Sequence, residues 1–88
     1  MLKVSFTNAF SKSVKTLKKR GYDISLLIDI IGKLVNDIPL DKKHHNHQLK
    51  GKYFGFYECH VRPDWLLIYT YEFNTLILVD TGTHSDLF

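Results

Sequence analysis

The sequence has one cysteine, two prolines and no long apolar run, and each shortage excludes a class of protein. Cys59 has no partner, which excludes a disulfide framework and a cysteine-rich zinc site. No stretch approaches the roughly 20 apolar residues of a membrane-spanning helix, and the first residues lack the apolar core of a signal peptide. We therefore expect a cytoplasmic protein with no membrane among its partners.

Acidic residues are missing from the first part of the chain. Residues 1–20 carry six lysines or arginines and no acid, whereas residues 21–88 hold all nine aspartates and glutamates. A basic segment of this kind favours a polyanion or an acidic partner, although a solvated helix face produces the same pattern.

The residues that are present suffice for one small domain. The chain has 88 residues, of which 44% are hydrophobic, and it shows no repeat or long linker. A chain of this size can bury a modest core. We therefore expect residues 1–88 to form a single domain.

The first half of the chain predicts a strand and two helices. Residues 2–6 alternate between apolar and polar, which is typical of a short strand. Thr7 or Asn8 can cap a first helix that Gly21 stops. Asp23 can cap a second helix that Pro39 ends, with an apolar stripe that we interpret as core. The stripe consists of Ile24, Leu27, Ile28, Ile31, Leu34, Val35 and Ile38.

The second half predicts a polar loop and three strands. Residues 39–51 are the loop, and strand-like segments follow at 52–60, 65–73 and 75–80. Short turns between strands require antiparallel pairing. The expected fold is α+β with the order β-α-α-β-β-β, in which a helical hairpin packs on a small antiparallel sheet.

The strand at 65–73 has two apolar faces. Alternation places Trp65 and Tyr69 on one face and Leu66 and Ile68 on the other. We expect the wholly apolar face of Leu66 and Ile68 to pack against the helices. Trp65 and Tyr69 would then lie on the open face, where aromatic rings can stack on the bases of a single-stranded nucleic acid.

All five histidines lie in the second half of the chain. His60 ends one strand and Asp64 begins the next, so a tight turn should bring an imidazole and a carboxylate together. His84 follows the last strand and should return to the same end of the sheet, and His47 would join them from the polar loop. Imidazole suits proton transfer near neutral pH.

The other two histidines and a metal site are the weaker interpretations. His44 and His45 have the pattern of exposed loop residues, and we leave them out of the catalytic set. Three or four histidines with Asp64 could hold zinc, but the helical spacings typical of zinc enzymes are missing. We therefore predict no metal ligands.

Three segments together resemble a known family. They are His47-Gln-Leu-Lys-Gly51, His60-Val-Arg-Pro-Asp64-Trp65, and Gly82-Thr-His84-Ser-Asp-Leu-Phe88. The chain resembles the YafQ branch of the RelE-like toxins over essentially its whole length. The resemblance implies a toxin of a type II toxin–antitoxin pair, which cleaves mRNA in the ribosomal A site without a metal or other cofactor and is blocked by a cognate antitoxin. The matching positions are His47, His60, Asp64, Trp65, His84 and Phe88.

The resemblance also implies roles for these residues. The RNA 2′-hydroxyl would attack the adjacent phosphate, with Asp64 and His60 as base and His84 as acid, or with the two labels exchanged. His47 would hold the phosphate, and Trp65 and Phe88 would position bases. The basic first helix would contact ribosomal RNA.

Two positions depart from the family pattern. The resemblance implies arginines that neutralise a phosphate, but the chain has Tyr57 and Asp80 at those places. Arg62, Lys50 or Lys52 could supply the missing charge. The alternative is a toxin homologue that has weak or no catalysis and acts mainly by binding its antitoxin and regulating its own promoter.

Overall fold

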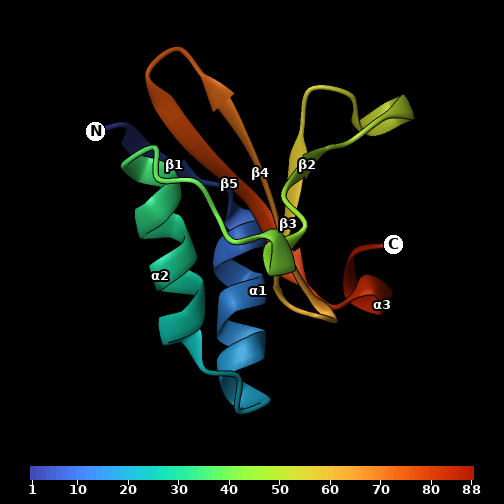
Figure 1. Ribbon diagram of the computed structural model, residues 1–88. Helices are drawn as coiled ribbons and strands as arrows, with labels where there is room; N and C mark the ends of the chain where they lie inside the picture. Colours follow the sequence, from blue (N-terminus) through green and yellow to red (C-terminus); the bar gives the residue numbers. More distant parts are fainter.

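The computed structural model describes residues 1–88 as a five-stranded sheet with a helical hairpin on one face (Figure 1). The hairpin consists of α1 (Asn8–Lys19) and α2 (Ile24–Val35). The strand order is β1-β5-β4-β3-β2; β1 is parallel to β5, and every other pair is antiparallel. The strands are β1 (Lys3–Phe6), β2 (His47–Gln48), β3 (Tyr57–Arg62), β4 (Trp65–Glu72) and β5 (Thr75–Gly82). The expected α+β arrangement is confirmed.

Both helices begin at the predicted caps. The Thr7 side chain accepts a hydrogen bond from the Phe10 N–H at 3.0 Å, and Asp23 accepts one from the Ser25 N–H at 3.1 Å. Such caps satisfy N–H groups that lack a partner within the helix. The second helix ends earlier than predicted, at Val35, because Asp37 adopts a left-handed backbone with φ of 56°.

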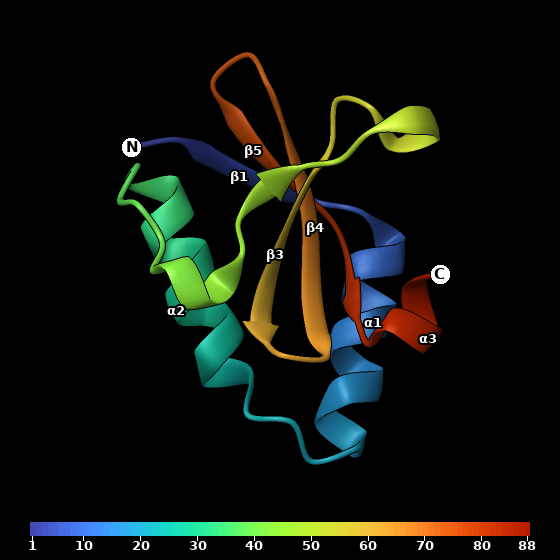
Figure 2. The ribbon, with the colours of Figure 1, turned by 45° about the vertical axis from the view of Figure 1, so that its right-hand side comes forward.

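Four short elements were not predicted. They are β2, the 3₁₀ turns η1 (Lys42–His44) and η2 (Gly51–Tyr53), and the one-turn helix α3 (His84–Leu87). The first strand after the loop begins at Tyr57 rather than at residue 52, because η2 occupies the intervening residues. Figure 2 shows η2 and the C-terminus projecting on the same side of the sheet.

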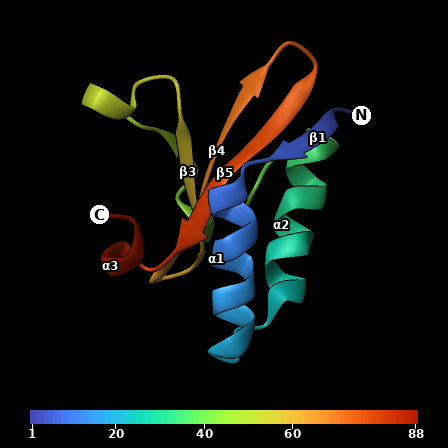
Figure 3. The ribbon, with the colours of Figure 1, turned by 180° about the vertical axis from the view of Figure 1, so that it is seen from behind.

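One cluster of 12 buried residues joins the helices to the sheet. Helix α1 packs against β5, and α2 lies beside α1 and contacts β3 (Figure 3). Leu27 and Leu34 of the predicted stripe belong to this cluster, but Ile28 is 63% exposed and Ile38 is also exposed. No helix is long and apolar enough to cross a membrane.

The predicted orientation of β4 is wrong. Trp65 and Tyr69 belong to the cluster beneath the helices and are each 1% exposed. The Tyr22 ring meets the Trp65 ring edge-on at 5.1 Å, and the Trp65 indole N–H donates to the Thr81 hydroxyl at 2.9 Å. The indole is therefore packed and hydrogen-bonded in the core.

Leu66 and Ile68 lie on the opposite face of the sheet. In the β3–β4 pairing, His60 is opposite Leu66 and Glu58 is opposite Ile68, so these four side chains share one face. His47 joins them because it pairs with Glu58 across β2 and β3. We call this surface the histidine face.

Candidate active site

Glu58 stands at the centre of the histidine face. Its Oε1 atom lies 3.6 Å from Nε2 of His47 and 3.6 Å from Nε2 of His60. The Glu58 side chain is only 10% exposed, and Leu66 and Ile68 form the apolar floor beside it. A carboxylate in such a place requires cationic or hydrogen-bonding partners. At 3.6 Å neither imidazole is hydrogen-bonded to it, and each becomes its cationic partner when the ring is protonated.

The sequence interpretation missed Glu58. The signal that could have found it is the alternation along β3, because Glu58 lies two residues before His60 and must share its face. It is also the only acid in a strand that is otherwise aromatic, apolar or basic.

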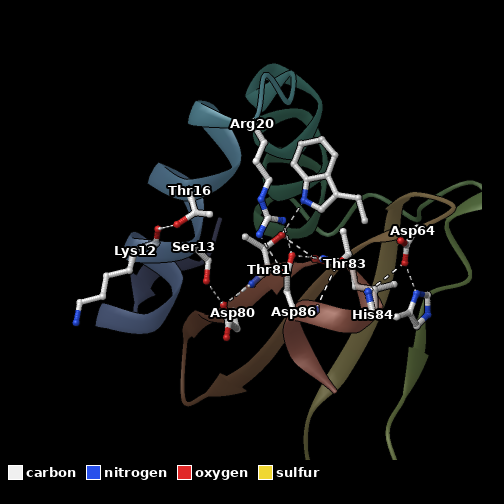
Figure 4. Close-up of polar contacts among 12 residues, drawn as sticks. Lys12, Ser13, Thr16, Arg20, Asp64, Asp80, Thr81, Thr83, His84 and Asp86 are labelled. Carbon is white, nitrogen blue, oxygen red and sulfur yellow. Dashed lines mark hydrogen bonds and ion pairs between the residues drawn. The ribbon is translucent and has the colours of Figure 1, made fainter.

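Asp64 pairs with His84 rather than with His60. Its Oδ1 atom accepts from the His84 ring nitrogen Nδ1 at 2.5 Å and from the His84 backbone N–H at 3.1 Å (Figure 4). These two hydrogen bonds from His84, first the ring and then the backbone, lower the pKa of Asp64 below its usual value. An ionised carboxylate accepts only, so Nδ1 carries a proton and Nε2 is the ring atom left for chemistry.

The two carboxylate–imidazole groups meet through ring contacts. The ring centroids of His60 and His84 are 5.8 Å apart, and those of His45 and His60 are 5.2 Å apart. Rings from the polar loop, β3 and α3 therefore form one row. The prediction that His84 returns to the Asp64 end of the sheet is confirmed.

The polar loop supplies His47 and also two residues, His44 and His45, that contact His60. Nδ1 of His44 lies 2.7 Å from the backbone oxygen of His60, and His45 reaches the His60 ring from a left-handed backbone with φ of 44°. His45 is exposed, as expected, whereas His44 is half-buried and lies in η1. Both residues contact His60, which the sequence did not predict.

A bidentate ion pair anchors α3. Arg20, at the end of α1, donates to both carboxylate oxygens of Asp86 at 2.8 and 3.1 Å. Asp86 also accepts from the Thr83 backbone N–H, which completes a capping box. Gly82 allows the close approach, because a Cβ atom there would lie 2.9 Å from the Cβ of Asp86. The ion pair and the cap therefore fix the short helix that carries His84.

The remaining predicted substrate-binding residues separate into two groups. Phe88, Lys50 and Lys52 are all exposed. Lys52 lies in η2, Lys50 directly precedes it, and the Phe88 ring meets the Tyr53 ring of η2. Trp65 is in the core, so it has no face free for a base. A β-bulge between His60 and Arg62 pairs Arg62 with Trp65 and turns it toward α2, where it lines a cavity of about 450 Å³. Arg62 therefore does not stand with the histidines.

The two departures from the family pattern also lie away from the histidine face. The Tyr57 ring stacks on the Tyr69 ring at 5.4 Å. Asp80 accepts from the Ser13 hydroxyl at 2.6 Å and from the Thr81 N–H at 2.8 Å, and Figure 4 shows it beside α1. The Asp80 carboxylate is therefore held against α1 and does not face the histidines.

Comparison with known proteins identifies the family. Residues 2–88 match the family model described as the bacterial toxin of a type II toxin–antitoxin system, YafQ. The chain belongs to the YafQ toxin family. It is 36% identical over 86 residues to the mRNA interferase toxin YafQ of Escherichia coli K12, which covers 97% of this chain and 94% of that protein.

Solved structures of the YafQ family agree with this fold. A metal-bound toxin from Helicobacter pylori superposes with a TM-score of 0.94 at 43% identity and covers 100% of both chains. YafQ in the E. coli DinJ–YafQ complex superposes with a TM-score of 0.92 at 35% identity and covers 100% of this chain and 99% of that one.

Because the H. pylori toxin is metal-bound, we asked whether side chains of this chain could coordinate a metal ion. No three histidine, cysteine, aspartate or glutamate side chains are arranged to hold one metal ion in this chain. Two imidazoles approach Glu58 at 3.6 Å, but Asp64 is engaged by His84. The arrangement does not fit a metal centre, and no step below uses one.

Proposed function

We propose that the chain is a ribosome-dependent mRNA endoribonuclease that cleaves by attack of a ribose 2′-hydroxyl. The observation that carries this proposal is the presence of two carboxylate–imidazole groups, Glu58 with His60 and Asp64 with His84, whose rings are 5.8 Å apart. Cleavage of RNA by its own 2′-hydroxyl needs one base and one acid on opposite sides of a phosphate, and such groups supply both. The E. coli relative is named an mRNA interferase, which agrees with this chemistry.

His60 takes the base role in this mechanism. Its ring accepts the proton of the 2′-hydroxyl as the 2′-oxygen bonds to phosphorus, and the buried Glu58 carboxylate stabilises the imidazolium that forms. Asp64, which the sequence suggested as the partner of His60, is instead hydrogen-bonded to His84, the general acid.

His84 takes the acid role. As the bond between phosphorus and the 5′-oxygen breaks, the Nε2 atom of His84 gives its proton to that oxygen, and Asp64 holds the ring by Nδ1. The products are a 2′,3′-cyclic phosphate and a free 5′-hydroxyl. General acid–base catalysis by each group contributes about 10²–10⁴-fold to the rate.

Charge on the phosphate is met by the remaining cations of the site. His47 shares Glu58 with His60 and is half exposed, so it can contact a non-bridging oxygen when protonated. Lys50 and Lys52 are exposed as well. His47, Lys50 and Lys52 would thus supply the positive charge that the sequence assigned in part to Arg62, whose side chain lies toward α2.

The basic face of α1 serves binding to the ribosome. Lys12, Lys15, Lys18 and Lys19 are all exposed, and α1 carries no acid. Lysines contact RNA phosphates through charge and do not read base identity. Helix α1 would therefore orient the protein on ribosomes in the cytoplasm but would not determine which codon is cut. A cognate antitoxin with an acidic segment would cover the same charge, as E. coli YafQ forms a complex with DinJ.

Induced expression in bacteria tests the proposal. Wild-type protein should arrest growth and cut mRNA at codons in the ribosomal A site, and the His84→Ala variant should relieve both. Glu72→Ala, at the exposed end of β4, is the control and should remain toxic. Continued toxicity of the His84 variant would remove His84 from the mechanism.

The alternative is an antitoxin-binding module without catalysis, favoured by the missing arginines at Tyr57 and Asp80. Wild-type protein that binds its antitoxin but neither arrests growth nor cuts mRNA would establish this alternative. The hydrogen bond from Ser13 of α1 to Asp80 and the stacking of Tyr57 weigh against it, because neither side chain obstructs the histidine face.

A further inference from the structure

An aromatic corner stands beside the row of histidine rings. The Tyr53 ring, from η2, meets the Phe88 ring, from the C-terminus, at a centroid distance of 5.7 Å and an angle of 88°. Residues 53 and 88 are 35 positions apart in the sequence, so the fold brings the two rings together. Figures 1 and 2 both show η2 and the C-terminus on the same side of the sheet.

The corner is not a piece of core. Phe88 remains 57% exposed and the adjacent Phe54 is 77% exposed, whereas Trp65 and Tyr69 are almost fully buried. Contiguous exposed apolar side chains mark binding surfaces more often than isolated ones do. Lys52 holds its ammonium 5.2 Å from the centre of the Tyr53 ring, which adds a cation at the corner.

The corner is also tied to the catalytic groups. The Phe88 backbone N–H donates to the His84 carbonyl oxygen at 2.9 Å, so Phe88 lies one helical turn beyond His84. On the other side, η2 follows His47 by only a few residues, and Gly51 and Gly55 shape it with φ values of 68° and 96°. A nucleotide next to the scissile phosphate would therefore lie within reach of both rings.

We propose that Tyr53 and Phe88 form a nucleobase-binding platform, with Lys52 taking the phosphate of the same nucleotide. The inference rests on the proposed function and extends it. The resemblance already implies that Phe88 positions a base, and the structure adds Tyr53 and Lys52 as its partners in place of the buried Trp65. Two perpendicular rings offer a base one face to stack on and one edge to contact, which suits any base of a single strand.

Binding of a fluorescent RNA tests the platform separately from catalysis. The probe is a single-stranded RNA with one 2-aminopurine and a 2′-deoxyribose at the cleavage position, measured free and in the A site of programmed ribosomes. Wild-type protein should change the 2-aminopurine fluorescence in at least one setting. Tyr53→Ala and Phe88→Ala should each weaken binding about tenfold, the usual effect of removing one stacking ring.

Three further variants decide what the rings do. Tyr53→Phe should bind as wild type because it keeps the ring, and Tyr53→Leu should bind as poorly as Tyr53→Ala because it keeps only apolar bulk. Phe73→Ala removes a fully exposed ring in the distant β4–β5 turn and should have no effect.

The outcomes separate this inference from the proposed function. Unchanged binding in Tyr53→Ala, full binding in Tyr53→Leu, or no fluorescence change with wild-type protein in either setting would overturn the platform. Ring-dependent binding by a wild-type chain that cuts no RNA would keep the platform and overturn the proposed cleavage.

Discussion

At the residue scale, the site depends on which carboxylate serves which imidazole. The sequence places Asp64 nearest to His60, but the structure gives Asp64 to His84 and Glu58 to His60. Glu58 was missed because a lone acid in an aromatic strand has no motif to mark it. Its role follows only from the strand pairing that sets it between His47 and His60.

Glu58→Gln tests the base. The amide keeps the size of the side chain but cannot stabilise an imidazolium, so kcat should fall about 10²-fold or more while KM changes little. Glu72→Gln, at the exposed end of β4, is the control. Steady-state cleavage on programmed ribosomes measures both constants, and equal kcat values for Glu58→Gln and wild type would exclude Glu58 from catalysis.

Trp65→Ala separates packing from RNA binding. Because Trp65 is 1% exposed and packs under the helices, its removal should reduce the free energy of unfolding by about 3–5 kcal/mol, as large core truncations do. Urea denaturation measures this change. A variant with wild-type stability but weakened RNA binding would restore Trp65 to the substrate site.

At the element scale, the helices were predictable and the faces of the strands were not. Thr7 and Asp23 are local caps that depend on a few neighbouring residues, so the sequence alone locates them. Alternation in β4 says which residues share a face, but both faces are apolar, and the sequence cannot say which one meets the helices. The deciding features, such as Tyr22 against Trp65, are long-range contacts.

The short elements were not predicted because they, too, depend on long-range contacts. Helix α3 has four residues, too few to be stable without tertiary contacts, and it exists because Arg20 holds Asp86. The bulge between His60 and Arg62 likewise interrupts the alternation that would have placed Arg62 beside His60. Both features depend on partners remote in the sequence.

Acid should release α3. Hydrogen bonds from Arg20, and then from the Thr83 backbone, hold the pKa of Asp86 well below its usual value, so folding stabilises the charged form. This contribution is fully present above the unfolded pKa of about 3.9 and is lost as the pH falls through the lower folded pKa. NMR signals of Phe88 should therefore stay native at pH 6 and shift toward a released form only below about pH 4.

Asp86→Asn provides the control for this release. It removes the charge, so its Phe88 signals should already be shifted at pH 6, and its kcat should fall because His84 is less well held. Release of wild-type α3 between pH 5 and pH 7, or native signals in Asp86→Asn, would contradict the role of the ion pair.

At the scale of the whole molecule, charge and chemistry are placed on different elements. Four exposed lysines lie on α1, while the histidine face lies across β2, β3 and β4 on the other side of the sheet. Cys59 lies between them in the core, where burial raises the pKa of its thiol to about 12, so it stays protonated and takes no part in chemistry. The arrangement predicts that binding to the ribosome and cleavage can be weakened separately.

Neutralising lysines of α1 tests this separation. The double variant Lys15→Gln/Lys19→Gln should bind ribosomes more weakly, with a salt dependence reduced by about one unit of slope for each lysine that contacts a phosphate. Its cleavage rate at saturating protein should match wild type. Lys33→Gln, on α2, is the control, and a lower saturated rate in the α1 variant would show that the two roles are not separate.

The chemistry of the cut RNA ends tests the central claim most directly. Wild-type protein is first stripped with EDTA and desalted, and is then mixed with ribosomes programmed with a defined mRNA in a buffer whose only divalent cation is magnesium. The ends at the cut are identified by mass spectrometry. The two carboxylate–imidazole groups predict a 2′,3′-cyclic phosphate and a 5′-hydroxyl, and no cleavage of an mRNA with 2′-deoxyribose at that position. A 3′-hydroxyl with a 5′-phosphate, cleavage of the deoxy-substituted mRNA, or activity that returns only when a transition metal is added to the stripped protein would contradict the mechanism.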